Sequence, residues 1–170
     1  MTWKEQLRTL KLQDLKRKYP AAYEASGGDD FILKPMSDKT ANGLTKCIID
    51  WITLKGGYAN RINTQGQARV NKIPRYNILT GKTEYRDSVT WTPSTTRIGT
   101  PDIDAIIQGK AVKIEVKIGK DKLSEAQKKH LEDIARAGGM YFVARDMDSF
   151  VNWYQQNFEN EHEQNNNRQE

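Results

Sequence analysis

Asp102-Ile-Asp-Ala-Ile-Ile-Gln-Gly-Lys-Ala-Val-Lys-Ile-Glu-Val-Lys117 is the stretch of this 170-residue chain that decides its fold. Apolar and polar residues alternate on both sides of Gly109-Lys110, which is the pattern of two β-strands joined by a tight turn. With Gly109-Lys110 as a two-residue turn, Asp104 faces Glu115 across the hairpin and Asp102 faces Lys117. The sequence therefore predicts an antiparallel hairpin in this register.

The two faces of that hairpin are predicted to differ completely. Side chains alternate across a strand, so three carboxylates and one ammonium group project from one face while the other face is apolar. A slip of one residue would bring charges into the apolar face, so the hydrophobic pattern selects this register. The charged face carries Asp102, Asp104, Glu115 and Lys117, and the apolar face carries Ile103, Ala105, Ile107, Val112, Ile114 and Val116.

The charged face suits a divalent cation. Carboxylates at close range repel one another and raise their own pKa values unless a cation neutralises them. Magnesium prefers oxygen ligands and commonly takes one or two carboxylates, with water and substrate phosphate completing its shell. Lys117 is placed to orient a water molecule or to stabilise charge in a transition state. The alternative is a solvent-facing hairpin whose acids pair with Lys113 and Lys117, in ion pairs that contribute up to ~1 kcal/mol.

The flanking sequence predicts helices and two further strands. Thr2 and Glu5 have capping-box spacing, Ser37 is expected to cap the second helix, and glycines or Pro20 end the helices. The expected helices span residues 2–19, 37–55, 124–137 and 148–158, and the expected strands span 58–63 and 140–144. The predicted fold class is α/β, a small mixed β-sheet flanked by helices. A basic helix and linker over 1–36 precede the main domain over 37–158, and a polar tail over 159–170 is expected to be disordered.

Positive charge is concentrated in one part of the chain. The net charge is +5, and basic residues outnumber acidic ones by eight to two between Lys55 and Arg97. Such an excess favours a polyanionic partner, although a solvated basic surface would look the same. Residues 65–97 are expected to form an irregular insert with a hairpin turning at Thr80-Gly81, in which bases and aromatic residues interleave, as in surfaces that bind phosphates and stack on bases. The expected DNA-contacting residues are Arg61, Asn63, Arg69, Lys72, Arg75, Lys82, Arg86 and Arg97.

The composition also argues against several classes of protein. Mean hydropathy is −0.81, and no run of about 18 apolar residues exists that would predict a membrane span. A single cysteine, Cys47, and the lack of a signal-peptide pattern predict a cytoplasmic protein with no membrane partner. Neither a G-x-S-x-G motif nor a P-loop is present. His130 is expected to pack or to be partly exposed, and it has no second histidine in the body with which to bind zinc.

Several short motifs resemble one known nuclease superfamily. Gly99-Thr-Pro-Asp102 followed by Glu115-Val-Lys117 resembles the signature of the PD-(D/E)XK nucleases, and Ser124-Glu-Ala-Gln127 is similar to a helix that carries a glutamine in several branches. The VRR-NUC branch shows similar features to Gly57, Arg61 and Asn63 ahead of the first motif, and to the glycines before the strand that ends near Ala144-Arg145. The resemblance covers about residues 37–150.

This resemblance implies a restriction-endonuclease-like fold and a function. It implies magnesium-dependent hydrolysis of phosphodiester bonds in DNA, with manganese able to substitute. Asp102, Glu115 and the backbone carbonyl of Val116 would bind the metal, Lys117 would be the catalytic lysine, and Gln127 would position water, metal or phosphate. Members of the VRR-NUC branch favour branched, flapped or junction DNA, and stand-alone members resemble Holliday-junction resolvases, which act as homodimers.

Three positions leave alternatives open. Ser124 and Gln127 also have capping-box spacing, so the Gln127 amide can simply satisfy the backbone of Ser124. Many relatives carry a glutamate in the helix before the first strand, where this chain has Asn42. Asp104, which the predicted register places opposite Glu115, is a candidate to replace that glutamate as a metal ligand. The rival functions are a catalytically inactive DNA-binding module of the same fold, which the missing glutamate favours, and an interaction protein that binds no nucleic acid.

Overall fold

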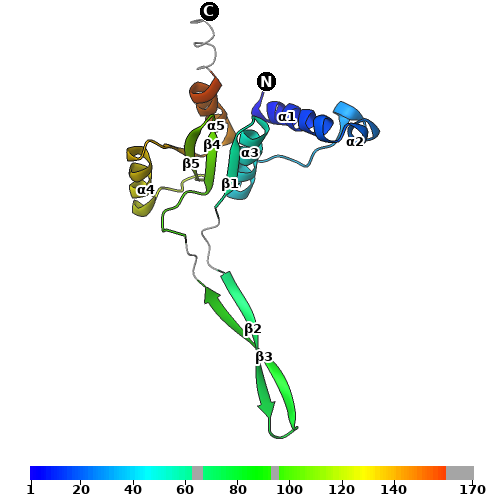
Figure 1. Ribbon diagram of the computed structural model, residues 1–170, viewed down its shortest axis with the longest axis vertical. Coiled ribbons are helices and arrows are strands. Elements are labelled where there is room, and N and C mark those ends of the chain that lie inside the picture. Colours follow the sequence, from blue (N-terminus) through cyan, green and yellow to red (C-terminus); the bar gives the residue numbers. More distant parts are fainter. Residues whose placement is uncertain (63–66, 93–95, 160–170) are drawn as a thin grey trace, which may run out of the picture. The chain divides into compact units, whose positions relative to one another are not determined.

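The chain forms two compact units, each described here by itself. The structure, a computed structural model (Figure 1), describes residues 1–62, 67–92 and 96–159. One unit contains residues 1–62 and the chain from Gly99 onward, and the other contains residues 63–98. We call the first unit the body and the second the ribbon.

A four-stranded mixed sheet forms the centre of the body. Its strands are β1 (Tyr58–Arg61), β4 (Ile103–Ile107), β5 (Lys110–Val116) and β6 (Met140–Ala144), in the order β1-β4-β5-β6. β4 pairs antiparallel with both β1 and β5, whereas β5 and β6 are parallel. Parallel neighbours need a crossover connection, which the helix between β5 and β6 provides. The predicted fold class, a small mixed sheet flanked by helices, is confirmed.

Helices cover both faces of this sheet. In Figure 1 the sheet lies between α4 on one side and α3 on the other. α1 and α5 pack with α3. Among the described residues, none of the helices has the length and apolarity needed to cross a membrane. The helices are α1 (Trp3–Lys18), α2 (Pro20–Ala25), a short 3-10 turn η1 (Gly28–Asp30), α3 (Ala41–Leu54), α4 (Glu125–Arg136) and α5 (Met147–Tyr154), which continues as a π-helical turn η2 (Gln155–Glu159).

The hydrophobic core lies on the α3 side of the sheet. All six residues of the predicted apolar face of the β4–β5 hairpin are buried, none more than 6% exposed. They join one cluster with the apolar stripe of α3, with α5 and with Trp3 and Leu7 of α1. Full burial of each large apolar side chain contributes about 1.5–3 kcal/mol relative to exposure. The basic helix α1 is therefore fixed to the body through its apolar face.

The turn of the β4–β5 hairpin is displaced by one residue from the predicted position. Ile107 pairs with Lys110, so the two central residues are Gln108 and Gly109, and both have positive φ angles of 50° and 77°. A primed turn requires positive φ at both central positions, and glycine meets this requirement at the second one. Moving a two-residue turn by one position changes every cross-strand partner by two residues. The predicted faces are therefore confirmed, whereas the predicted pairs are wrong.

One predicted helix start is wrong, and the predicted linker after the first helix contains a further helix. Thr40, and not Ser37, caps α3, because its side chain accepts a hydrogen bond from the backbone of Gly43. The Ser37 hydroxyl accepts from the backbone of Lys39 and so closes a local turn before the helix begins. Pro20 ends α1 but also opens α2, where a missing N–H is tolerated in the first turn.

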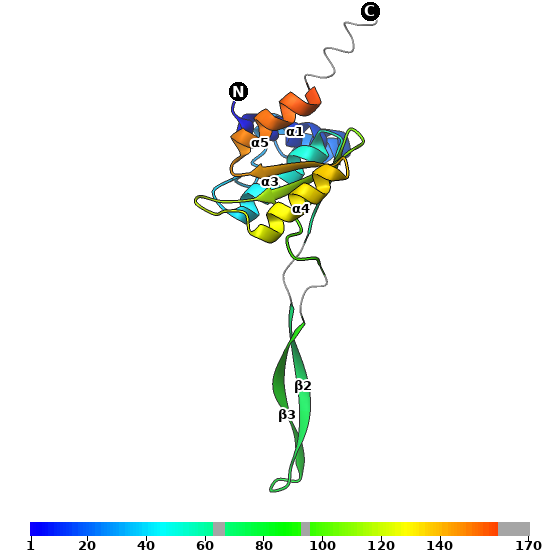
Figure 2. The ribbon, with the colours of Figure 1, turned by 90° about the vertical axis from the view of Figure 1, so that its left-hand side faces the viewer.

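The ribbon is a long antiparallel hairpin (Figure 2). β2 (Gln67–Asn77) and β3 (Lys82–Thr92) pair along their full length, and Asn77 pairs with Lys82 at the closed end. The predicted turn at Thr80-Gly81 is confirmed, and Gly81 has a φ of 63°. The expectation of an irregular insert is wrong, because the two strands pair regularly over eleven positions.

The body should fold without the ribbon. The chain leaves the body at Ile62, whose backbone N–H donates to the carbonyl of Asp102 at 2.8 Å, so a short connection can join the two ends. We expect that replacing residues 63–98 with a flexible Gly/Ser linker leaves one cooperative thermal transition, with Tm within about 5 °C of the intact chain. Loss of cooperative unfolding in circular dichroism would contradict the division into two units.

Candidate active site

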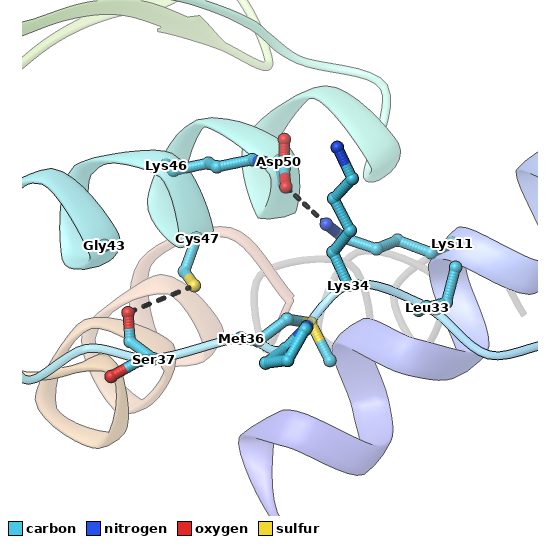
Figure 3. Close-up of a pocket in the computed structure, with 10 residues that line it drawn as sticks. Lys11, Leu33, Lys34, Met36, Ser37, Gly43, Lys46, Cys47 and Asp50 are labelled. Atoms are coloured by element: carbon cyan, nitrogen blue, oxygen red, sulfur yellow. Dashed lines mark hydrogen bonds and ion pairs between the residues drawn. The ribbon is translucent and has the colours of Figure 1, made fainter.

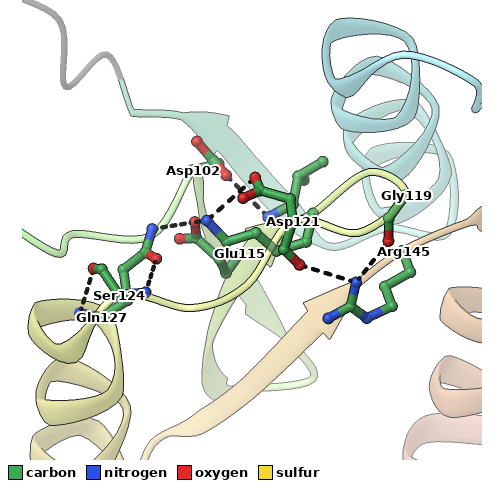
Figure 4. Close-up of polar contacts among 9 residues, drawn as sticks. Asp102, Glu115, Gly119, Asp121, Ser124, Gln127 and Arg145 are labelled. Carbon is green, nitrogen blue, oxygen red and sulfur yellow. Dashed lines mark hydrogen bonds and ion pairs between the residues drawn. The ribbon is translucent and has the colours of Figure 1, made fainter.

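Four predicted site residues meet on the face of the sheet opposite the core. Asp102 precedes β4, Glu115 lies near the end of β5, Lys117 follows β5, and Gln127 lies in the first turn of α4. Figure 4 shows Asp102 and Glu115 gathered beside the start of α4, together with Asp121 from the loop that follows β5. The β4–β5 hairpin and the residues at its ends thus supply Asp102, Glu115 and Lys117, and α4 adds Gln127.

Asp102 is held by backbone hydrogen bonds on both sides. Its Oδ2 accepts from the backbone N–H of Val116 at 2.9 Å, and its own carbonyl accepts from Ile62. Continuation of the β4–β5 register brings Asp102 opposite Glu115 instead of the predicted Lys117. The correction brings the two predicted metal-binding carboxylates closer together along the sheet.

Glu115 is the most deeply buried acid of the site. It is 3% exposed, although it is charged at high pH. Its Oε1 atom accepts from the Nε2 atom of Gln127 and lies 3.2 Å from the Nζ atom of Lys117. Its Oε2 atom is buried and has no hydrogen-bond partner among the described residues. A buried carboxylate oxygen without a partner is costly, so this atom is free to bind a ligand.

The surroundings raise the pKa of Glu115. Burial raises it most and the negative charge of Asp102 raises it further, while Lys117 lowers it, and the result is about 7 against an ordinary value of 4.5. Near neutral pH the protein therefore holds this carboxyl close to half protonation. A divalent cation beside it would favour the ionised form.

Lys117 is buried between two acids. It is 8% exposed, and its Nζ atom lies 3.6 Å from the Oδ2 atom of Asp121 in addition to its contact with Glu115. Arg145, at the end of β6, donates to the backbone carbonyls of Gly119 and Asp121 and so fixes this loop. Sequence reasoning missed Asp121 and Arg145 as site residues. The spacing of four residues between Lys117 and Asp121 was the only signal for the first, and tertiary contact alone reveals the second.

Gln127 completes the capping box that the sequence predicted and also binds a predicted site acid. Its Oε1 atom accepts from the backbone N–H of Ser124 at 2.9 Å, which completes the capping box of α4. Its Nε2 atom donates to Glu115. The cap therefore fixes the orientation of the amide, and the amide in turn fixes one oxygen of the buried acid.

Asp104 lies opposite Lys113 on β5 and not opposite Glu115. It pairs with Lys113 on β5 and forms an ion pair with it, so the predicted position opposite Glu115 is wrong. The physical reason is the shifted turn, which moves every partner by two residues. The prediction that Asp104 binds metal rested on a position opposite Glu115, and Asp104 does not have that position. Its carboxylate forms an ion pair with Lys113 instead.

The donor set of the site is made of oxygen. Among residues 1–62, 67–92 and 96–159, no three His, Cys, Asp or Glu side chains are grouped as a metal site. Asp102 and Glu115 provide two carboxylates, and magnesium commonly binds proteins through one or two carboxylates while water and phosphate fill its other positions. Two carboxylates with an unpartnered oxygen on Glu115, counted among the described residues, are hard oxygen donors that fit magnesium or manganese better than zinc.

Two of the other buried polar atoms without a hydrogen-bond partner among the described residues lie on β6 and α4. These are the hydroxyl of Tyr141 on β6 and the Nδ1 atom of His130 on α4. Tyr141 pairs with Lys113 and therefore projects from the face of the sheet that carries Glu115, and burial together with the charges of Glu115 and Asp102 raises its pKa. Sequence reasoning treated β6 as a plain apolar strand and missed Tyr141. Its parallel pairing with Lys113 is a tertiary feature.

The predicted DNA-contacting residues divide between the two units. Arg61 on β1 donates to the Oδ1 atom of Asn42 on α3 at 2.8 Å. Asn42, at the position where relatives carry a glutamate, therefore binds an arginine side chain. Asn63 lies outside the described residues. The ribbon unit carries the other six, which are Arg69, Lys72, Arg75, Lys82, Arg86 and Arg97.

A separate pocket of about 300 Å³ lies between α1, the segment before α3, and α3 (Figure 3). Lys11, Lys34 and Lys46 line it, and Lys11 forms an ion pair with Asp50. The buried thiol of Cys47 lies at its base, and burial raises its pKa, which disfavours the reactive thiolate. This pocket is on the α3 side of the sheet, whereas Asp102 and Glu115 lie on the opposite face.

The sequence matches no protein-family model, and no curated protein is significantly similar to it. The geometry of the acidic site is therefore the main support for any function.

Gly99 allows the loop before Asp102 to approach α4. Its φ is 88°, and an added Cβ would lie 2.5 Å from the carbonyl oxygen of Ala126. Gly109 has a similar φ of 77° but open space around it, so it is a matched control. We expect Gly109→Ala to lower the free energy of unfolding by about 1–2 kcal/mol through backbone strain alone, and Gly99→Ala by about 3 kcal/mol or more because steric overlap is added. Equal losses in denaturant melts would contradict the close approach.

Glu115 should make stability depend on pH. Because the folded-state pKa of about 7 exceeds the ordinary 4.5, stability from the protonated form is full below about pH 4.5 and is lost as the pH rises to about 7. Glu115→Gln is neutral throughout. In EDTA, we expect the Tm of this variant minus that of the intact protein to increase by about 5 °C between about pH 5 and pH 8. The exposed residue Glu132, changed to Gln, should show no such trend. A flat difference for Glu115→Gln would contradict the raised pKa.

Proposed function

We propose that this protein is a magnesium-dependent DNA endonuclease, as its resemblance to the PD-(D/E)XK nucleases of the VRR-NUC branch suggests. One observation carries the proposal: the buried Glu115 beside Asp102 has one oxygen held by Lys117 and Gln127 and a second oxygen without a partner in the described part of the chain. A purely structural ion pair would leave no carboxylate oxygen buried and unsatisfied. The small mixed sheet flanked by helices also supports the proposal, because the resemblance implies an α/β fold of this kind.

Asp102 and Glu115 are the residues that would hold the metal, with the carbonyl of Val116 as a third donor. A bound magnesium ion supplies Lewis acidity toward a phosphate oxygen and toward water. The backbone N–H of Val116 fixes Asp102 through Oδ2, and Gln127 fixes Glu115 through Oε1. Both acids are therefore positioned before any ligand binds, which lowers the cost of organising the site.

Lys117 provides positive charge from a largely buried position. Its ammonium group is held between Glu115 and Asp121, so it stays near the position where a phosphate would lie against the acids. There it would orient the attacking water or stabilise negative charge that develops on the phosphate. An exposed lysine would be screened by water and would contribute much less.

The ribbon provides a surface for DNA. Four basic residues and only one acid, Glu84, project from one of its faces because their positions alternate in register along the two strands. A two-stranded β-ribbon fits the major groove of DNA, and basic side chains on it bind phosphates. The basic residues of this face are Arg69, Arg75, Lys82 and Arg86.

A DNA-binding module without catalysis is the alternative. One observation favours it: α3 has Asn42 where many relatives carry the helix glutamate, and Asn42 is bound to Arg61. The acid closest to it in sequence, Asp38, accepts from the backbone of Met147 at 3.1 Å and so caps a different helix. The intact acids and lysine of the site argue for cleavage, since binding alone does not require them.

Cleavage assays with linear, flapped and four-way junction DNA test the proposal. We expect the purified protein to cut at least one branched DNA with magnesium or manganese and none with EDTA. Lys117→Ala should lower the cleavage rate by about 100-fold or more, since such groups typically contribute that much. DNA binding measured by fluorescence anisotropy should persist, because the ribbon is unchanged.

Lys113→Ala is the matched control. Lys113 lies on β5 and projects from the same face of the sheet as Glu115, but its ammonium group binds Asp104 and not Glu115. We expect its cleavage rate to stay within about threefold of the intact protein, since it loses only a partly exposed ion pair. Salt-sensitive binding without cutting under any metal would favour the DNA-binding module, and the absence of both activities would reject the proposal.

A further inference from the structure

The two faces of the ribbon differ in chemistry. The polar face carries the basic residues named above. The opposite face has one lysine and one aspartate, and its other residues are apolar or uncharged. This second face, which we call the apolar ribbon face, consists of the cross-strand pairs Ala68–Trp91, Val70–Val89, Lys72–Asp87, Pro74–Tyr85 and Tyr76–Thr83.

The apolar ribbon face is open to solvent. Val70, Tyr76, Tyr85, Val89 and Trp91 are each 62% to 68% exposed. β2 and β3 form a two-stranded sheet of their own, so no third strand pairs with either of them in the described part of the chain. An isolated two-stranded hairpin is marginally stable in water, and several large apolar side chains exposed on one face mark a candidate interaction surface.

The order of residues on this face makes it complementary to itself. Three of the five pairs join a large side chain to a smaller one, with Trp91 opposite Ala68, Tyr85 opposite Pro74 and Tyr76 opposite Thr83. Consider a second ribbon packed face to face, related by a two-fold axis parallel to the strands. Each residue then lies over the copy of its own cross-strand partner, so each large side chain lies over a small one. Packed sheets require this kind of interdigitation.

The same operation also matches the charges. The pair Lys72–Asp87 lies at the middle of the five pairs. In the two-fold arrangement, Lys72 of each copy lies over Asp87 of the other, so two opposite-charge contacts form at the centre. The face carries no net charge, whereas the polar face is strongly basic and would repel its own copy. The partner that fits both shape and charge is therefore the same surface.

We propose that the apolar ribbon face is the dimer interface of this protein, formed by two ribbons packed face to face. The polar faces of both ribbons then point outward. The proposal goes beyond the endonuclease activity and does not depend on it. Strands of eleven residues give a face about 37 Å long and two strands wide. This is smaller than a typical permanent interface, so we expect a dimer that dissociates on dilution into the micromolar range.

Charge variants in a mixing experiment test the interface. Lys72→Asp gives a face with two acids, and Asp87→Lys gives a face with two bases. Either variant alone should weaken its own dimer by tenfold or more, because like charges meet at the centre. An equimolar mixture of the two should form a heterodimer of about twice the 19.5 kDa monomer mass in sedimentation equilibrium without DNA. Both variants lack the cross-strand pair within the chain, so recovery on mixing reports contact between chains.

Glu84→Lys is the matched control. Glu84 pairs across the strands with Arg75 on the polar face, so this change also replaces an acid by a base in a cross-strand pair. It should leave the dimer constant unchanged within about twofold. An intact protein that stays monomeric at all concentrations would overturn the proposal. That result would mean that the apolar ribbon face has another partner, such as the bases of single-stranded DNA. Failure of the two variants to associate on mixing would overturn it as well.

Discussion

The alternation of side chains along β5 is the constraint on which the body depends. Val112, Ile114 and Val116 enter the core on the α3 side, and the residues between them project toward α4. One strand therefore supplies both the central apolar contacts of the fold and the buried acid of the site. A strand that slipped by one residue would lose both at once, because the side-chain period is two. Selection for the core and selection for the site act on the same register.

Burial of Glu115 and Lys117 costs free energy that the core must offset. An ion pair taken out of water is stabilising only with good geometry and additional hydrogen bonds. Glu115 has these for one oxygen only, through Gln127 and Lys117. The remaining oxygen and the raised pKa show that the site is not optimised for the stability of the protein without a ligand. Such a compromise is common where a group must bind something else.

The two units divide the work of the proposed enzyme. The body positions a few groups by burial, short hydrogen bonds and the close approach of Gly99 to α4. The ribbon relies on cross-strand pairing and presents two chemically distinct faces, one basic and one apolar. Because its strands are regular, each face follows directly from residue parity. In the proposed function, the basic face of the hairpin would bind DNA and the apolar face would bind a second copy of the chain.

The sequence alone determined the fold class, the capping boxes of α1 and α4, and which face of the β4–β5 hairpin is buried, because these depend on local spacing and on the period of two. It did not determine the cross-strand partners. The choice between Gln108-Gly109 and Gly109-Lys110 as turn residues changes no face, so the hydrophobic pattern is the same for both. Only the tertiary structure decided that Asp104 pairs with Lys113, that Asn42 binds Arg61 and that Tyr141 projects from the same face of the sheet as Glu115. These contacts join elements distant in the chain, and their geometry depends on how the sheet and helices pack together.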